Sequence, residues 1–148
     1  MNHKITFNID FDGTCTTHDF PRIGKDIGAV PVLKDLVSAG HKLILFTMRS
    51  DREGMAHSAD HPEVHPQSDM YLTHAVQWFR DNEIPLHGIQ TNPDQRTWTD
   101  SPKSYAHLMI DDSALGCPLV HGSELSPKPF VDWVAVRKSL ELMGILRP

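Results

Sequence analysis

The sequence predicts an α/β fold in which a mainly parallel central sheet is covered by helices on both faces. Short continuous apolar runs, which are typical of buried parallel strands, alternate along the chain with longer segments of helical periodicity. This alternation requires crossover connections between strands, and such connections make the sheet parallel. In sheets of this kind, ligands bind beyond the carboxyl ends of the strands.

The elements are expected in a regular order. Their ranges are a strand at 4–10, a loop at 13–23, a helix at 26–39, a strand at 42–47, a loop at 48–68, a helix at 69–82, a strand within 84–91, a loop at 92–102, a strand at 107–111, a short strand at 118–120 and a helix at 131–143. Apolar residues recur at helical spacing in 26–39, and Gly40 suits the end of that helix.

Two carboxylates follow the first strand, in the sequence Asp10-Phe11-Asp12-Gly13-Thr14. Like charges held this close at the end of a buried strand repel one another, and burying them is costly unless they are paired or bind a metal. Gly13 permits a tight turn that a residue with a Cβ would resist. The alternative is that both acids are ordinary turn formers, since Asp-Gly is a common turn signal.

Three further segments carry polar residues suited to phosphate or metal chemistry. Thr47 ends the second strand, Lys103 follows Ser101-Pro102, and Asp111-Asp112 end the strand at 107–111. Taken singly, each has an ordinary explanation: a capping Thr, a solvated Lys and a helix N-cap pair.

Together, in this order and spacing, these segments resemble the four motifs of the haloacid dehalogenase (HAD) superfamily of phosphotransferases, from about Ile5 to Asp112. Lys103 stands eight residues before Asp111, a spacing that the family commonly shows. The resemblance implies a Rossmann-like, HAD-type three-layer sandwich. Because the chain is short, it is similar to the minimal-cap phosphatases, which have no separate cap domain. Thr47-Met48-Arg49 is also loosely similar to the phosphatase halves of polynucleotide kinases.

The resemblance implies an Mg²⁺-dependent phosphatase that hydrolyses a phosphate monoester through an aspartyl-phosphate. Asp10 would be the nucleophile and Asp12 the general acid and base. Mg²⁺ prefers oxygen ligands, which Asp10, the backbone carbonyl of Asp12, and Asp111 would supply. Asp112 would lie behind them, bonded to a metal-bound water or to Lys103.

Substrate binding is expected from the segment 47–49 and from Lys103. The Thr47 hydroxyl would bond phosphoryl oxygens, and Lys103 would stabilise charge in the transition state. Met48 belongs to this segment, and Arg49 either clamps a second phosphate or is an exposed Arg at a helix start. The substrate is left open among nucleotides, sugar phosphates and polynucleotide ends.

Length, charge and composition limit the kinds of protein that this chain can be. A chain of 148 residues is long enough for one sizeable core, so we expect a single domain over 1–148. The net charge of −5 and the lack of a basic run give no strong signal for nucleic-acid binding. No run of 18 apolar residues suggests a membrane span, and the first strand begins too early for a signal peptide, so we expect a cytoplasmic protein. Two cysteines make no disulfide framework.

Neither gap between the motifs has room for a folded cap. We therefore expect an open site, which either accepts a large or extended phosphoester or is closed by a neighbouring subunit of a homo-oligomer.

Several other residues suggest chemistry of their own. His57, His61 and His65 have the spacing of a zinc site on a helix, but Pro62 and Pro66 favour a polar loop. These histidines are therefore expected to lie in an ordinary loop.

Two smaller possibilities concern nucleophilic and aromatic groups. Cys15 with His18 could form a thiol nucleophile and its base, but this would leave the four acidic positions unexplained. Trp98 is the one aromatic considered for a base or sugar contact, with packing in the core as the preferred alternative.

Two rival functions remain beside the phosphatase. The first is a receiver-like module that accepts a phosphoryl group for signalling, and the second is a non-catalytic binding module. In receivers the phosphorylated Asp ends a middle strand, whereas here the middle strand ends in Thr47. Asp12 also supplies an acid and base that a signalling site would avoid.

Overall fold

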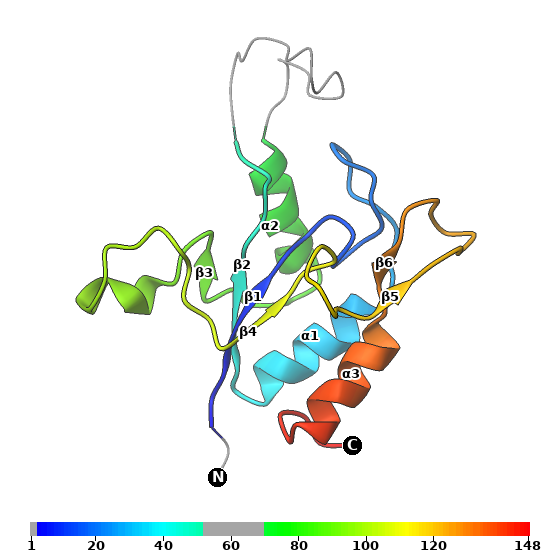
Figure 1. The fold of residues 1–148 in the computed structure, drawn as a ribbon. Coiled ribbons are helices and arrows are strands. Elements are labelled where there is room, and N and C mark those ends of the chain that lie inside the picture. The colour runs from blue at the N-terminus through cyan, green and yellow to red at the C-terminus, as the bar shows by residue number, and fades with distance from the viewer. Residues whose placement is uncertain (1–2, 52–69) are drawn as a thin grey trace.

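The computed structural model describes residues 3–51 and 70–148 (Figure 1). Four parallel strands form the central sheet in the order β3-β2-β1-β4, and a second, two-stranded sheet pairs β5 with β6. This arrangement confirms the α/β class and the mainly parallel sheet. The histidines at 57, 61 and 65 lie outside the described residues.

The observed helices and strands follow the order expected from the sequence, and most of their boundaries lie close to the expected ones. The elements are β1 (Thr6–Ile9), α1 (Ala29–Ser38), β2 (Lys42–Leu45), α2 (Tyr71–Asp81), β3 (Gly88–Ile89), the 3₁₀ helix η1 (Pro93–Thr97), β4 (Leu108–Ile110), β5 (Leu119–Val120), β6 (Phe130–Val131) and α3 (Trp133–Leu142). The expected loop at 92–102 thus contains a short helix.

Two predicted helix starts are wrong, each for a local reason. α1 begins three residues after Asp26, because the Asp26 carboxylate accepts the N–H of Gly28, which has a positive φ of 88°. α3 begins at Trp133 rather than at Val131, because Val131 pairs with Leu119 in the small sheet. Asp132 then caps the helix by accepting the N–H of Ala135.

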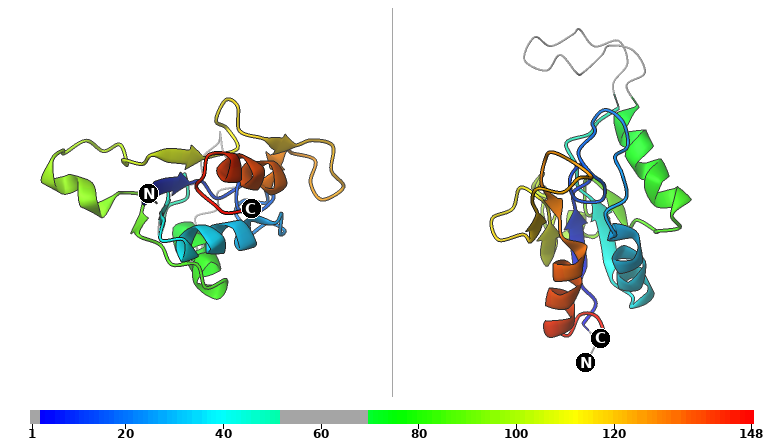
Figure 2. Two further views of the ribbon diagram at one scale, coloured as in Figure 1. Left: turned by 90° about the horizontal axis from the view of Figure 1, so that it is seen from below. Right: turned by 90° about the vertical axis from the view of Figure 1, so that its right-hand side faces the viewer.

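One face of the central sheet carries the hydrophobic core. Phe7 and Ile9 of β1 belong to a single buried apolar cluster with residues of all three α-helices, including Leu33, Phe79 and Leu140. The views in Figures 1 and 2 show α1 and α3 on the same side of the strands, with η1 protruding from the other side. Consecutive right-handed crossovers from β1 to β2 to β3 explain why α1 and α2 share a face.

The other face is covered by η1 and the residues that connect it to β4. Asn8, which is 1% exposed, donates its side-chain N–H to the carbonyl of Ser104 and accepts the Ser104 hydroxyl. Gln95 donates to the carbonyls of Ser101 and Lys103 and accepts the N–H of Tyr105. The Asn8–Ser104 bonds attach this layer to β1, whereas the Gln95 bonds hold the layer together internally. Buried amide hydrogen bonds of both kinds are costly to break without replacement.

In the described residues, α1 connects β1 to β2, α2 lies between β2 and β3, and η1 lies between β3 and β4. In this same part of the chain, every helix is too short or too polar to cross a membrane.

The core predicts a contrast between two identical substitutions. Leu33→Ala removes a fully buried side chain, so we expect the free energy of unfolding to fall by about 2–5 kcal/mol. Leu142→Ala removes a side chain that is 81% exposed, and its effect should stay below about 1 kcal/mol. Urea denaturation of both variants measures this difference, and equal losses would contradict the assignment of the core.

Candidate metal centre

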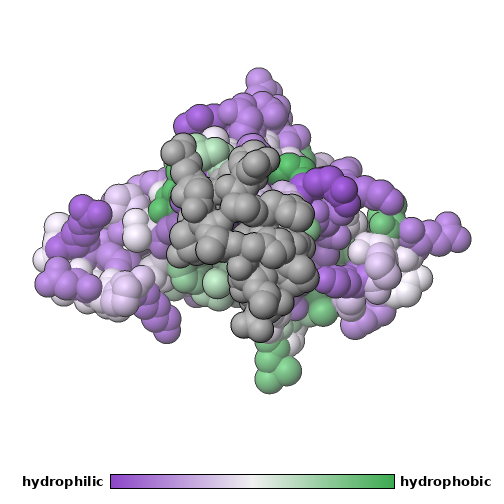
Figure 3. All heavy atoms as spheres, turned by 90° about the horizontal axis from the view of Figure 1, so that it is seen from above, coloured by the Kyte–Doolittle hydropathy of each residue, from purple (hydrophilic) through white to green (hydrophobic). Residues whose placement is uncertain are grey.

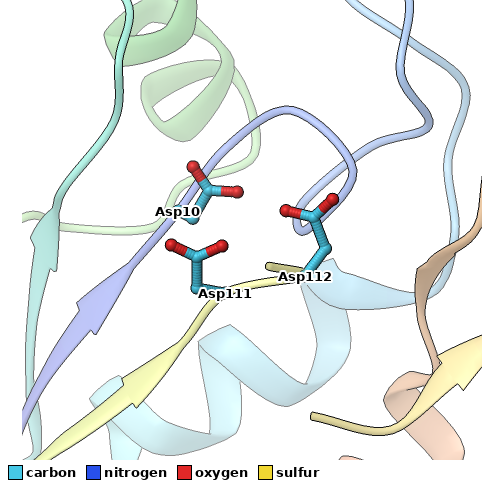
Figure 4. A group of neighbouring side chains, drawn as sticks. All are labelled: Asp10, Asp111 and Asp112. Atoms are coloured by element: carbon cyan, nitrogen blue, oxygen red, sulfur yellow. The ribbon is translucent and has the colours of Figure 1, made fainter. Parts of the chain in front are cut away.

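Three carboxylates meet beyond the ends of β1 and β4. These strands pair in parallel with Ile9 opposite Ile110, and the N–H of Asp10 continues the pairing by donating to the Ile110 carbonyl at 3.0 Å. The register therefore brings Asp10 next to Asp111. Asp112 follows, and one oxygen from each of the three side chains lies within 4.8 Å of the others (Figure 4).

The electrostatics of Asp10 disfavour its ionised form. Burial, opposed by a 2.7 Å hydrogen bond from the Thr14 hydroxyl and reinforced by the charge of Asp111, raises the pKa of Asp10 from 3.8 to about 8. The three carboxylates are therefore costly to ionise together. A divalent cation would remove this cost, and a set of carboxylate oxygens suits Mg²⁺. The donor set fits the expected metal.

His18 holds the third carboxylate in place. Its Nε2 lies 2.7 Å from Oδ2 of Asp112, and the Asp112 backbone N–H donates to the Thr14 hydroxyl at 3.0 Å. Lys103, the expected side-chain partner of Asp112, does not make this contact. Sequence reasoning missed the role of His18, because nothing in the spacing of residues 18 and 112 indicates that they meet.

Gly13 is required where these residues converge. Its φ is +79°, a conformation that L side chains rarely adopt. A Cβ built at this position would overlap the ring of His18 and the carboxylate of Asp112. The turn of the first motif therefore passes directly against the His18–Asp112 pair.

The alternative of a cysteine nucleophile does not fit this geometry. Cys15 is fully buried, its thiol donates to the carbonyl of Asp10 at 3.3 Å, and burial raises the thiol pKa well above its ordinary value. A reactive cysteine needs the opposite, an accessible thiol with a lowered pKa. His18, its expected base, is engaged by Asp112.

Asp12 lies in a different environment from Asp10, because Arg49 pairs with both of its oxygens. The Arg49 Nε donates to Oδ2 at 2.8 Å and one terminal nitrogen donates to Oδ1 at 2.7 Å. The guanidinium lies 5.0 Å from the ring centre of Phe11 and 5.2 Å from that of Phe20. Such a bidentate pair fixes the plane of the Asp12 carboxylate.

The remaining donors of Arg49 are also occupied. They bond the backbone carbonyls of Pro21, Arg22 and Tyr71 at 3.2, 2.7 and 3.3 Å. With the two bonds to Asp12, all five guanidinium N–H groups have acceptors. Arg49 is only 2% exposed, so it is neither a solvated Arg at a helix start nor a free phosphate clamp. We reassign it as the partner of Asp12.

The other expected substrate residues surround the exit of β2. Thr47 is half-buried, and its hydroxyl oxygen accepts the N–H of Arg49 at 3.1 Å. Gln90 accepts the Thr47 N–H and donates to the Thr47 carbonyl, a contact that the sequence does not indicate. Met48 is 96% exposed.

Lys103 is exposed, and its ammonium forms no ion pair with any residue of the described ranges. Its backbone is held, since Gln95 donates to its carbonyl and the next residue, Ser104, is bound by Asn8. The structure thus brings the Lys103 loop against β1 without pairing the ammonium with Asp10.

Comparisons with known proteins support the fold. No family model matches the chain, and no curated protein matches it. A solved structure of a conserved protein from Bacteroides thetaiotaomicron is similar to it, with 26% identity and a TM-score of 0.67 over 95% of this chain and 93% of that chain.

The raised pKa of Asp10 predicts how stability depends on pH. An acid whose pKa is higher in the folded protein binds more protons when folded, so stability falls as pH rises from about 4 to 8. Asp10→Asn removes this ionisation. In EDTA, we expect the variant to have a higher Tm than the native protein at pH 8 and a similar Tm near pH 4.

Thermal denaturation across this pH range, with Asp81→Asn on the exposed face of α2 as the matched control, measures the effect. MgCl₂ should raise the Tm of the native protein at pH 8 and leave that of Asp10→Asn nearly unchanged. Parallel pH curves for the native protein and Asp10→Asn would contradict the assignment.

The pairing of Arg49 predicts that even a conservative change is harmful. Arg49→Lys keeps the charge but loses the planar guanidinium with its five N–H donors, which leaves buried acceptors unpaired. We therefore expect the free energy of unfolding to fall by about 2 kcal/mol or more. Arg137→Lys, in a more exposed pair with Asp35, should cost less than about 1 kcal/mol. Urea denaturation measures the free energy of unfolding of both variants. A smaller decrease for Arg49→Lys than for Arg137→Lys would contradict the importance of the bidentate pairing.

Proposed function

We propose that this protein is an Mg²⁺-dependent phosphatase of the HAD superfamily, which hydrolyses a phosphate monoester through an aspartyl-phosphate on Asp10. The observation that carries this proposal is the meeting of Asp10, Asp111 and Asp112 within 4.8 Å at the carboxyl edge of a parallel sheet. Asp12 follows Asp10 by two residues, and its carboxylate forms an ion pair with Arg49. The order of these residues along the chain is that of the family motifs.

The proposed metal would be held by the Asp10 and Asp111 carboxylates and the Asp12 backbone carbonyl. When bound, Mg²⁺ supplies positive charge that offsets both the carboxylates and the substrate phosphate. Asp112, anchored by His18, would orient the water molecules around it.

In the first step, a carboxylate oxygen of Asp10 forms a bond to phosphorus while the bond from phosphorus to the alcohol oxygen breaks. Asp12 gives its proton to the leaving oxygen. In the second step, Asp12 takes a proton from a water molecule that attacks phosphorus, which releases phosphate and restores Asp10. The bonds from Arg49 use one lone pair of each Asp12 oxygen, so each oxygen retains a second for this proton.

Thr47 and Lys103 would bind the phosphoryl group. The Thr47 hydroxyl accepts a bond from Arg49, which leaves its own proton free to donate to a phosphoryl oxygen. Among residues 3–51 and 70–148 the Lys103 ammonium has no ion-pair partner, and its loop is anchored next to β1, so its charge would attract a bound phosphate.

We also propose that the enzyme is cytoplasmic. Cys15 and Cys117 are both free thiols, a state that a reducing compartment maintains. A receiver-like phospho-acceptor is the alternative function, and the same assay separates the two.

Hydrolysis of p-nitrophenyl phosphate tests the proposal. Turnover should require Mg²⁺ and stop in EDTA. Asp10→Asn should abolish it, and Asp12→Asn should lower kcat by about 10²–10⁴-fold. Asp81→Asn, with the same substitution on an exposed helix face, should retain native activity.

The test has a clear opposite outcome. Absence of turnover, together with stable labelling of Asp10 by acetyl phosphate in mass spectrometry, would replace the phosphatase with the receiver-like module. Absence of both turnover and labelling would leave a non-catalytic binding protein.

A further inference from the structure

A groove of about 500 Å³ lies on the sheet face that carries η1. Asn8 and Met109 line it from β1 and β4, and Trp98, Lys103 and Tyr105 line it from the segment between η1 and β4. Its volume is in the range of pockets that bind small molecules.

The register of the strands places this groove next to the carboxylates. Asn8 pairs with Met109, and each stands two residues before an acid of the cluster, Asp10 and Asp111 respectively. Side chains two apart on a strand share a face and are separated by about 7 Å along it. A ligand whose phosphate meets Asp10 can therefore extend into the groove.

The walls of the groove are aromatic and unusually exposed. Trp98 is 63% exposed and Tyr105 is 45% exposed, so the expected packing of Trp98 in the core is wrong. Their rings meet edge to face at 5.5 Å, and Tyr105 continues to His107 at 5.4 Å. Seen from above in Figure 3, the lobe formed around η1 is hydrophilic to neutral. Two exposed rings in contact along one groove offer aromatic surface on which a ligand ring can pack.

The backbone behind these rings is rigidly held. Gln95 and Asn92, which are 5% and 3% exposed, bond the N–H and the carbonyl of Tyr105 respectively. Asn8, also buried, holds the neighbouring Ser104. A wall that is ordered before the ligand arrives lowers the entropic cost of binding.

We propose that this groove binds a flat aromatic or heteroaromatic ring of the substrate, with Lys103 at its border attracting the phosphate. The inference rests on the proposed function for the position of the phosphate. It narrows the substrate to phosphate esters that carry such a ring, nucleobase-bearing esters among them. Any flat aromatic ring has a face that can stack on Trp or Tyr, so the groove would accept different rings. A phosphate ester of a purely aliphatic alcohol would leave the groove unfilled.

Binding measured by calorimetry tests the proposal independently of turnover. We expect adenosine 5′-monophosphate to bind the native protein in MgCl₂ at least about tenfold more tightly than ribose 5-phosphate, which lacks the ring. Trp98→Ala should remove this difference, and Trp98→Phe should restore most of it. Leu115→Ala, at a fully exposed side chain outside the groove, should preserve it.

Several results would overturn the inference: equal affinities for the two ligands, no binding of either, or an equal loss of affinity for both in Trp98→Ala. These results are equilibrium affinities, so they do not depend on whether the protein hydrolyses a phosphate ester. If the native protein binds adenosine 5′-monophosphate more tightly than ribose 5-phosphate but hydrolyses no ester, the proposed function is refuted and the proposed ring-binding groove is supported.

Discussion

The parallel pairing of β1 with β4 is the constraint on which the rest of this structure depends. Continued by one residue, its register places Asp10 beside Asp111, where two like charges must share a partly buried edge of the sheet. The surroundings orient these groups: Thr14 donates to Asp10, and the Trp133 indole donates to the Thr14 carbonyl at 2.7 Å, which ties the turn to α3. Neutral hydrogen bonds of this kind fix geometry but supply no net charge, so they do not offset the repulsion between ionised carboxylates.

The two acids of the first motif have opposite electrostatic environments although only one residue separates them. Asp10 faces other carboxylates, whereas Asp12 faces a guanidinium whose five donors are all engaged. A raised pKa favours the protonated form of Asp10, so this residue could serve as the proposed nucleophile only when a nearby positive charge lowers its pKa. The pairing with Arg49 also explains why Arg49 is buried: its charge is offset by Asp12 and its remaining N–H groups by three carbonyls.

The two faces of the sheet are built by different interactions. Apolar side chains join the α-helices to one face, whereas on the other face Asn8 joins β1 to the η1 layer and Gln95 holds that layer together. Hydrogen bonds are directional and apolar contacts are not, so the amide layer determines the position of the backbone at Lys103 and Tyr105 more narrowly than a hydrophobic layer would. A small part of the protein thereby presents a fixed loop and exposed rings next to the carboxylates.

The sequence by itself determined the order of strands and helices and the strand ends near which Asp10, Thr47 and Asp111 lie, because each follows from local periodicity. Only the tertiary structure decided the partners of these residues. His18 meets Asp112 across 94 positions and Arg49 meets Asp12 across 37. Trp98 lies at the surface because the layer that carries it is held by amides and encloses no apolar core. Such contacts depend on how distant segments pack, which periodicity along one chain does not encode.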